Sequence, residues 1–147
     1  MRPDPYPPLV DDRGAAAVEV ATRVVALAAA LREDAADLLA AESLTLPLAD
    51  AVWVLDPALG PQPRKQVAAR LSCDPSNVTV LADRLAAMGL LERVEDPGDR
   101  RVRALRLSAA GAAVRERIGG ALAQAAPLGA LDDRELALLA DLLRRTG

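Results

Sequence analysis

The side chains with the clearest chemical potential in this sequence lie on one face of a single predicted helix. The helix is expected to begin at Asp74, whose carboxylate can accept from first-turn N–H groups, and at Pro75, which loses no bond at the first helical position. Its polar face carries, in order, Ser76, Asn77, Thr79, Val80, Asp83 and Arg84. Small hydrogen-bonding groups followed by a long cation suit contacts with phosphates and base edges in a major groove.

The expected roles differ along this face. Ser76 and Thr79 lie near the helix N-terminus, where hydroxyls and the helix dipole favour phosphate. Asn77, Val80 and Arg84 are the candidates for base edges: an amide for adenine, an alkyl group for a thymine methyl, a guanidinium for guanine. The alternative is that these are ordinary solvent-facing helix residues.

The opposite side of this helix and the segment before it predict a two-helix unit. The apolar seam consists of Val78, Leu81, Leu85 and Met88, and Gly89 is expected to end the helix. A shorter helix is predicted over residues 64–71, with inner positions at Val67, Ala68 and Leu71. Only two residues separate it from Asp74, which is the spacing of a helix-turn-helix. At its start, Arg64 and Lys65 are candidates for phosphate contacts.

A basic hairpin is predicted directly after this unit. Strand-like runs at residues 90–94 and 100–107 flank a turn that contains Pro97 and Gly98. The tip and the returning strand hold Arg100, Arg101, Arg103 and Arg106. A basic hairpin beside a recognition helix is a wing, and Arg100 and Arg103 are expected to neutralise phosphates.

Three motifs in this region carry a resemblance. They are LAAMGLLER at residues 85–93, DRR at 99–101 and LSAAG at 107–111. In order and spacing they resemble the MarR family of winged-helix transcription regulators, and a looser pattern extends from about residue 44 to 143. One departure is Ala86, where the family commonly has Glu.

The resemblance implies a fold class that is mainly α with a small β-wing, and it implies roles in the wing. Asp99 would orient the wing, and Arg101 would enter the minor groove, where narrow A·T-rich segments concentrate negative potential. Without the resemblance, Asp99 and Arg101 could form a plain ion pair that stabilises the turn by about 0–1 kcal/mol.

The chain is expected to divide into a proline-rich flexible arm at residues 1–13 and one domain at 14–147. Within it, residues 44–108 form the winged helix-turn-helix region, and residues 14–43 and 109–147 supply dimerisation helices. The 14–42 stretch is apolar on more than one helical face, with a break expected near residues 32–34. Too little chain remains to cover such a helix, so burial against a second subunit is inferred; the alternative is an Ala-rich surface helix.

The C-terminal helices have clear start signals. Ser108 is expected to cap a helix over residues 109–125 that could be interrupted at Gly119 and Gly120. Asp132 and Glu135 have the spacing of a capping box. The helix that follows carries an apolar stripe of Leu136, Leu138, Leu139, Leu142 and Leu143.

Two single residues invite functional hypotheses. Trp53 belongs to a helix predicted over residues 44–55, with Thr45 as its cap and a loop at 56–63 after it. The resemblance places a small-molecule cleft near this helix, so Trp53 is a candidate ligand contact; the alternative, a core tryptophan, is preferred. Cys73 is interpreted as a packing residue of the turn rather than as an oxidant sensor.

Composition excludes several functions. The 147 residues contain no histidine and one cysteine, which removes the commonest general base, the commonest metal ligand and any intramolecular disulfide. The sequence has no phosphate-binding glycine loop and no set of residues with the spacing of metal ligands. We therefore expect no enzymatic activity, no catalytic residue, no metal and no cofactor. No signal-like start and no bilayer-spanning run were identified, which predicts a cytoplasmic protein without a membrane partner.

Charge distribution favours a nucleic-acid partner despite a net charge of −3. Residues 62–107 hold nine Lys or Arg against six Asp or Glu, a net of +3, so the remainder carries −6. Together with this distribution, the resemblance to the MarR family implies a homodimeric regulator, a repressor of a pseudo-palindromic double-stranded operator, that a small amphipathic or aromatic ligand releases. The alternative is a winged-helix module for dimerisation or protein contact, against which the wing arginines argue.

Overall fold

The computed structural model describes residues 11–99 and 101–146, and the chain divides into two compact units. One unit comprises Ala35–Ala125, and the other comprises Met1–Asp34 together with Ala126–Gly147. The described part is mostly helical with one small antiparallel sheet, so the predicted fold class is confirmed. The expected arm at residues 1–13 lies mainly outside the described residues, and the first helix begins at Asp12.

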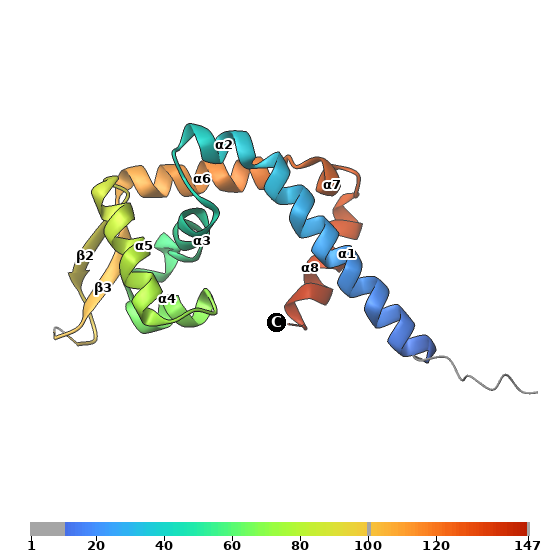
Figure 1. Cartoon of the computed structure of the whole chain (residues 1–147), viewed down its shortest axis with the longest axis horizontal. Helices are drawn as coiled ribbons and strands as arrows, with labels where there is room; N and C mark the ends of the chain where they lie inside the picture. The colour runs from blue at the N-terminus through green and yellow to red at the C-terminus, as the bar shows by residue number, and fades with distance from the viewer. Residues whose placement is uncertain (1–10, 100, 147) are drawn as a thin grey trace, which may run out of the picture. The chain divides into compact units, whose positions relative to one another are not determined.

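The helix-turn-helix forms the centre of the Ala35–Ala125 unit. Helices α3 (Leu46–Val54), α4 (Arg64–Arg70) and α5 (Pro75–Ala87) pack against one another, as Figure 1 shows. Their inner side chains are almost completely buried: Val52, Val67, Val78 and Leu85. Burial of a large aliphatic side chain stabilises a fold by about 1.5–3 kcal/mol, so this cluster fixes α5 on its support. The predicted seam is wrong at one position, because Met88 is exposed and Ala82 is buried in its place.

Tight C-terminal turns end both helices of the pair. The N–H of Leu90 donates to the Leu85 carbonyl at 2.9 Å, while Gly89 has φ +73°, as the sequence predicted for a terminal glycine. The same pattern ends α4, but there the left-handed position is taken by Ser72, with φ +51°. This turn sets the direction in which α5 leaves α4.

The wing is a three-stranded antiparallel sheet with the order β1-β3-β2. Strands β2 (Leu91–Glu95) and β3 (Arg103–Leu107) form the predicted hairpin, with Leu91 opposite Leu107 and Glu95 opposite Arg103. Strand β1 (Gln62–Pro63) pairs with β3. The prediction of a plain loop at residues 56–63 is therefore wrong, since this stretch also contains the short helix η1 (Pro57–Leu59).

Helix α6 (Ala109–Ala123) connects the wing with the helical part of this unit. The Ser108 hydroxyl accepts from the Gly111 N–H at 3.1 Å, which confirms the predicted cap, and donates to the Gly89 carbonyl at 2.6 Å. Helix α6 runs without interruption through Gly119 and Gly120, the two positions where the sequence allowed a break. It also contacts α3 and the short helix α2 (Ala36–Ala41).

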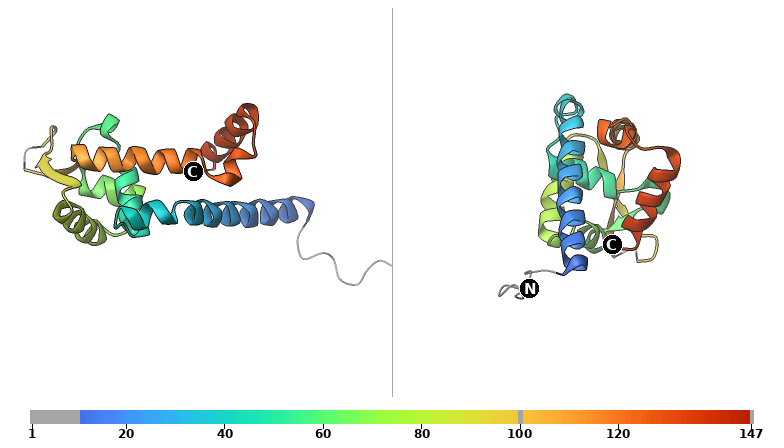
Figure 2. Two further views of the ribbon diagram at one scale, coloured as in Figure 1. Left: turned by 90° about the horizontal axis from the view of Figure 1, so that it is seen from above. Right: turned by 90° about the vertical axis from the view of Figure 1, so that its right-hand side faces the viewer.

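The second unit contains α1 (Asp12–Asp34), α7 (Ala126–Gly129) and α8 (Asp133–Arg144). Helix α1 contacts α7, whose first N–H, that of Ala126, donates to the Asp34 carboxylate at 2.9 Å. The predicted capping box of α8 is present, with reciprocal bonds between Asp132 and Glu135 of 2.8 and 2.9 Å. Helix α1 is unbroken over its 23 residues (Figure 2), and the chain leaves it at Ala35, one residue beyond the expected break.

Large apolar side chains of this unit are exposed. They are Val18, Val20, Val24 and Val25 on α1 and Leu138, Leu142 and Leu143 on α8. By length and composition alone α1 could also cross a bilayer, with a mean hydropathy of 1.6 over its most apolar window. The expectation that no such segment exists is thus wrong on these two criteria, although Glu19 and Arg23 lie within the helix.

Candidate nucleic-acid interface

Helix α5 presents the predicted polar face to solvent. Its N-cap is Asp74 with an extended backbone, and Pro75 occupies the first turn, as expected; the Asp74 side chain, however, makes no capping hydrogen bond. Four of the predicted contact residues are exposed: Ser76, Asn77, Val80 and Arg84. They share one side of α5 because residues three to four apart neighbour each other on a helix.

Thr79 differs from its neighbours because its hydroxyl already has two partners. Its Oγ1 lies 3.2 Å from the Pro75 carbonyl and 2.9 Å from Nη1 of Arg64. Arg64 comes from the first turn of α4, so this bond joins the two helices of the helix-turn-helix. Lys65, the next residue, is exposed on α4.

Carboxylates organise the backbone at the tip of the wing. Oδ1 of Asp96 accepts from the N–H groups of Gly98 at 2.7 Å and Asp99 at 3.1 Å. Oδ1 of Asp99 in turn accepts from the Arg101 N–H at 3.0 Å. Two backbone bonds close the turn, from Asp96 N–H to Val102 and from Val102 N–H to Asp99. The tip is therefore a hydrogen-bonded turn rather than an open loop.

Two arginines of the wing are open to solvent. Arg101 and Arg103 are exposed, and Arg100 lies outside the described residues. Among the ion pairs of residues 11–99 and 101–146, none joins Asp99 to Arg101. The carboxylate instead orients the backbone of Arg101, which leaves the guanidinium available for an external partner.

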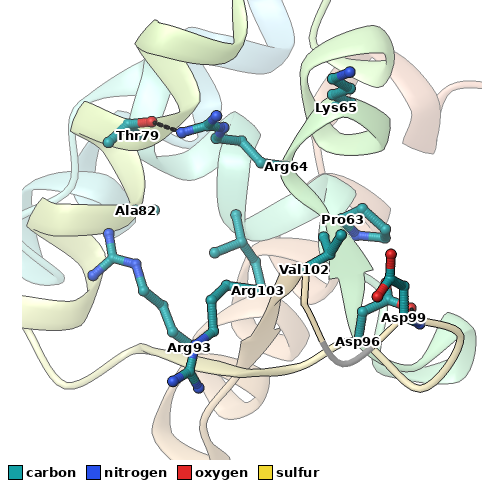
Figure 3. A pocket seen from close by; sticks show the side chains of 11 residues that line it. Pro63, Arg64, Lys65, Thr79, Ala82, Arg93, Asp96, Asp99, Val102 and Arg103 are labelled. Carbon is teal, nitrogen blue, oxygen red and sulfur yellow. Dashed lines mark hydrogen bonds between the residues drawn. The ribbon is translucent and has the colours of Figure 1, made fainter.

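A groove of about 550 Å³ lies between α5, the start of α4 and the wing (Figure 3). Four cationic side chains line it, with two carboxylates on the wing side and several apolar groups. The cations are Arg64, Lys65, Arg93 and Arg103. An excess of positive charge in a groove between a recognition helix and a wing favours an anionic backbone.

Arg93 is a residue to which the sequence analysis assigned no role. Nη2 of Arg93, on β2, forms an ion pair and a hydrogen bond with the Asp83 carboxylate of α5. A free Asp83 carboxylate would repel a phosphate backbone, and this contact partly neutralises it. The signal was present in the sequence as opposite charges on two adjacent predicted elements. On β3, Arg106 is likewise paired with Glu92 of β2 at 2.7 Å.

The preferred interpretation of Trp53 as a core residue is wrong, whereas its candidacy as a ligand contact stays a prediction. Trp53 is 41% exposed and lines neither the groove beside the wing nor the hollow beside α5. The guanidinium carbon of Arg115 lies 4.7 Å from the centre of its ring, while the same side chain bonds to the Trp53 carbonyl and to Asp56. Such a cation–π contact is worth about 0.5–2 kcal/mol and holds α6 against α3.

A second hollow of about 370 Å³ lies beside the outer face of α5. Pro47, Asp50, Cys73, Asn77 and Val80 are among its lining residues. Cys73 is half-buried and packs against the apolar core, which agrees with its interpretation as a packing residue of the turn. In the described residues no group of three or more His, Cys, Asp or Glu is arranged to hold a metal ion.

Comparisons with known proteins agree with this geometry. The sequence profile of the MarR family matches residues 58–102, which run from within η1 through the helix-turn-helix to the tip of the wing. No curated protein sequence matches the chain at a significant level. Solved structures do match it, and three of them are informative.

The PcaV transcriptional regulator from Streptomyces coelicolor, solved with its natural ligand, is 33% identical, with a TM-score of 0.53; the match covers 69% of this chain and 73% of PcaV. A MarR family protein from Bacillus stearothermophilus is 25% identical over 93% of this chain and 95% of its own, with a TM-score of 0.69. A mutant of MarR from E. coli, solved in complex with operator DNA, shares the fold at 20% identity and a TM-score of 0.66, over 92% and 99% of the two chains.

The order of elements, the cationic groove between α5 and the wing, the profile match and the similarity to PcaV lead to one assignment. This chain belongs to the MarR family of winged-helix, DNA-binding transcription regulators.

Proposed function

We propose that the chain is a sequence-specific regulator that binds a pseudo-palindromic double-stranded operator as a cytoplasmic homodimer and has no catalytic activity. The observation that carries the proposal is the exposed polar face of α5 beside a wing in which Arg101 and Arg103 are exposed and form no ion pair within the described residues. Both belong to the same unit, and a groove with four cations separates them. A pure dimerisation module has no use for this arrangement.

Each side chain of the interface has a proposed partner on DNA. Arg64, Lys65, Ser76 and Arg103, with Arg100 beyond the described residues, contact phosphates. Asn77, Val80 and Arg84 meet base edges in the major groove. Asp99 holds the wing backbone so that Arg101 enters the minor groove. Thr79 contributes through Arg64.

The dimer is proposed from the exposed apolar surface of the other unit. Four valines of α1 and three leucines of α8 are exposed to water. Seven large apolar side chains on two helices are more than the single exposed apolar residues that are normal on a protein surface. A two-fold dimer would bury them and would place two recognition helices about one helical turn of DNA apart.

The proposed direction of regulation is repression, relieved by a small amphipathic or aromatic ligand. Support comes from the relatives: PcaV was solved with its natural ligand and the MarR mutant with operator DNA. Trp53 remains a candidate contact for such a ligand, because 41% of the residue is exposed while Arg115 covers part of its ring. A ligand that binds only the released form would shift the dimer away from DNA.

Fluorescence anisotropy tests the proposal. The chain is titrated into labelled DNA from upstream of its own gene and into a scrambled duplex, across a series of salt concentrations. The proposal predicts tighter binding to the native duplex and a logarithmic salt slope of about −0.9 per phosphate neutralised. Weak and equal binding to both duplexes, followed by no enrichment from random DNA, would favour the dimerisation module instead.

A further inference from the structure

The hydroxyl of Thr79 has little capacity left for DNA. A threonine hydroxyl has one proton to donate and two lone pairs to accept. The proton is directed to the Pro75 carbonyl at 3.2 Å, and a lone pair accepts from Arg64 at 2.9 Å. A phosphate oxygen needs a donor, so direct contact would require the hydroxyl to give up its bond to Pro75.

The guanidinium of Arg64, in contrast, keeps most of its donors. It has five N–H groups, and one of them is directed to Thr79. No carboxylate within residues 11–99 and 101–146 forms an ion pair with Arg64, although its neighbour in the groove, Arg93, is paired with Asp83. Arg64 therefore retains its charge and its fork of donors for a phosphate.

The hydrogen bond to Thr79 fixes the position of the Arg64 guanidinium. Arginine has many rotamers and loses conformational entropy when its side chain is fixed. Figure 3 shows the Arg64 side chain reaching from α4 across the edge of the groove to Thr79 on α5. If the guanidinium is already held in place before DNA binds, less conformational entropy is lost on binding, and the affinity is higher.

We infer that Thr79 is a positioning residue: its hydroxyl holds the Arg64 guanidinium at the edge of the groove for a DNA phosphate and does not contact DNA itself. The inference rests on the proposed function. It predicts that the contributions of Thr79 and Arg64 to DNA affinity depend on each other.

A double-mutant cycle tests this dependence, with a duplex enriched from random DNA by the wild-type chain as the probe. Thr79→Val should weaken binding about 3- to 10-fold when Arg64 is present, and by less than about 1.5-fold in an Arg64→Ala background. Thr79→Ser keeps the hydroxyl and should bind within about twofold of wild type.

The salt dependence separates positioning from a merely structural role. Arg64→Ala should lower the magnitude of the logarithmic salt slope by about 0.9, and Thr79→Val should lower it in the same direction. A loss of helix stability alone would reduce affinity without changing the slope. Ser76→Ala is the matched control, because its effect should simply multiply with that of Arg64→Ala.

Thermal unfolding of every variant establishes that it is folded, and Thr79→Ala replaces Thr79→Val in the cycle if the valine variant does not fold. Equal losses from the Thr79 substitution in both backgrounds would overturn the inference and assign Thr79 a contact of its own. If the wild-type chain enriches no duplex at all, the proposed function fails, and the inference fails with it; the two failures are distinguished by the wild-type measurement.

Discussion

At the scale of single residues, the carboxylates of the interface bind groups of the protein itself, while Arg64, Arg101 and Arg103 are exposed and form no ion pair within the described residues. Asp96 and Asp99 accept backbone N–H groups of the wing, and Asp83 pairs with Arg93. Acidic groups that would repel a phosphate backbone are thus partly occupied. The account at this scale depends on Arg101, whose backbone is oriented and whose side chain is exposed.

Arg101→Ala should raise the Kd for operator DNA about tenfold, since one charged groove contact is worth about 1–3 kcal/mol. Its unfolding midpoint and its dimer mass should stay at wild-type values, because the side chain contacts solvent. Arg144→Ala, which removes the same charge from α8 opposite its leucine stripe, is the control and should leave the affinity unchanged. Identical Kd values for the Arg101 variant and the wild type at matched salt would remove Arg101 from the mechanism.

At the scale of elements, contacts between the end of α5 and the start of α6 fix how α6 follows the wing. Ser108 bonds to both Gly89 and Gly111, and Gly111 lies directly against the backbone of Leu90. A Cβ added at Gly111 would lie 2.0 Å from the Leu90 carbonyl oxygen, which no rotamer change can relieve. At Gly120 of the same helix, an added Cβ meets nothing within 4 Å.

Gly111→Ala is therefore expected to destabilise the chain by about 3 kcal/mol, as overpacking against a backbone does. Gly120→Ala should stabilise it by about 0.5–1 kcal/mol through helix propensity. Denaturant unfolding of both variants measures the difference. If both behave alike, the close approach of α6 to the end of α5 is not present in solution.

The ion pair between Glu42 and Arg117 links the end of α2 to α6, with 2.6 Å between Oε1 and Nε. The hydrogen bond from Arg117 holds the pKa of Glu42 below its ordinary value of 4.5. A lowered pKa in the folded state means that the stabilisation is present above pH 4.5 and is lost as the pH falls through the folded-state pKa. Glu42→Gln should accordingly show a smaller loss of stability on acidification below pH 4.5 than the wild type does, in unfolding curves recorded against pH. A loss equal to that of the wild type would mean that the pair does not form.

Local signals predicted most elements, whereas contacts between distant segments could not be read from the sequence. Ser108, Gly89 and the pair Asp132 and Glu135 are strong markers because their hydrogen bonds close within a few residues. The strand β1 has two residues, one of them proline, and exists only because β3 lies beside it. The bond between Arg64 and Thr79 likewise depends on how α4 crosses α5.

The sequence correctly predicted which residues share the exposed face of α5. It could not predict the hydrogen-bond partners and the exposure of each side chain. Helical periodicity was sufficient to group Ser76, Asn77, Val80 and Arg84. It was not sufficient to tell that the hydroxyl of Thr79 is occupied or that Met88 turns to solvent, since both depend on the neighbouring helix and wing.

At the scale of the whole molecule, two kinds of surface are segregated by unit. The Ala35–Ala125 unit carries the basic groove, and the other unit carries exposed valines and leucines on α1 and α8. Separate surfaces allow DNA contact and self-association to be altered independently.

Leu138 is 60% exposed and belongs to the leucine stripe of α8. Leu138→Glu should convert the proposed dimer to a monomer, because a carboxylate cannot be buried there without a partner. Ala137→Glu, on the opposite side of the same helix, should leave the dimer intact. Light scattering after size exclusion gives both masses, and a dimeric Leu138 variant would place the interface elsewhere.

Selection of duplexes from random DNA by the wild-type chain tests the central claim most directly. The account predicts an enriched pseudo-palindrome whose half-sites are centred about one helical turn, 10–10.5 base pairs, apart. It also predicts that Arg101→Ala weakens binding to that motif. A selection without an enriched motif, from a chain that is folded and dimeric, would contradict the account and leave the winged helix as a module for protein contact.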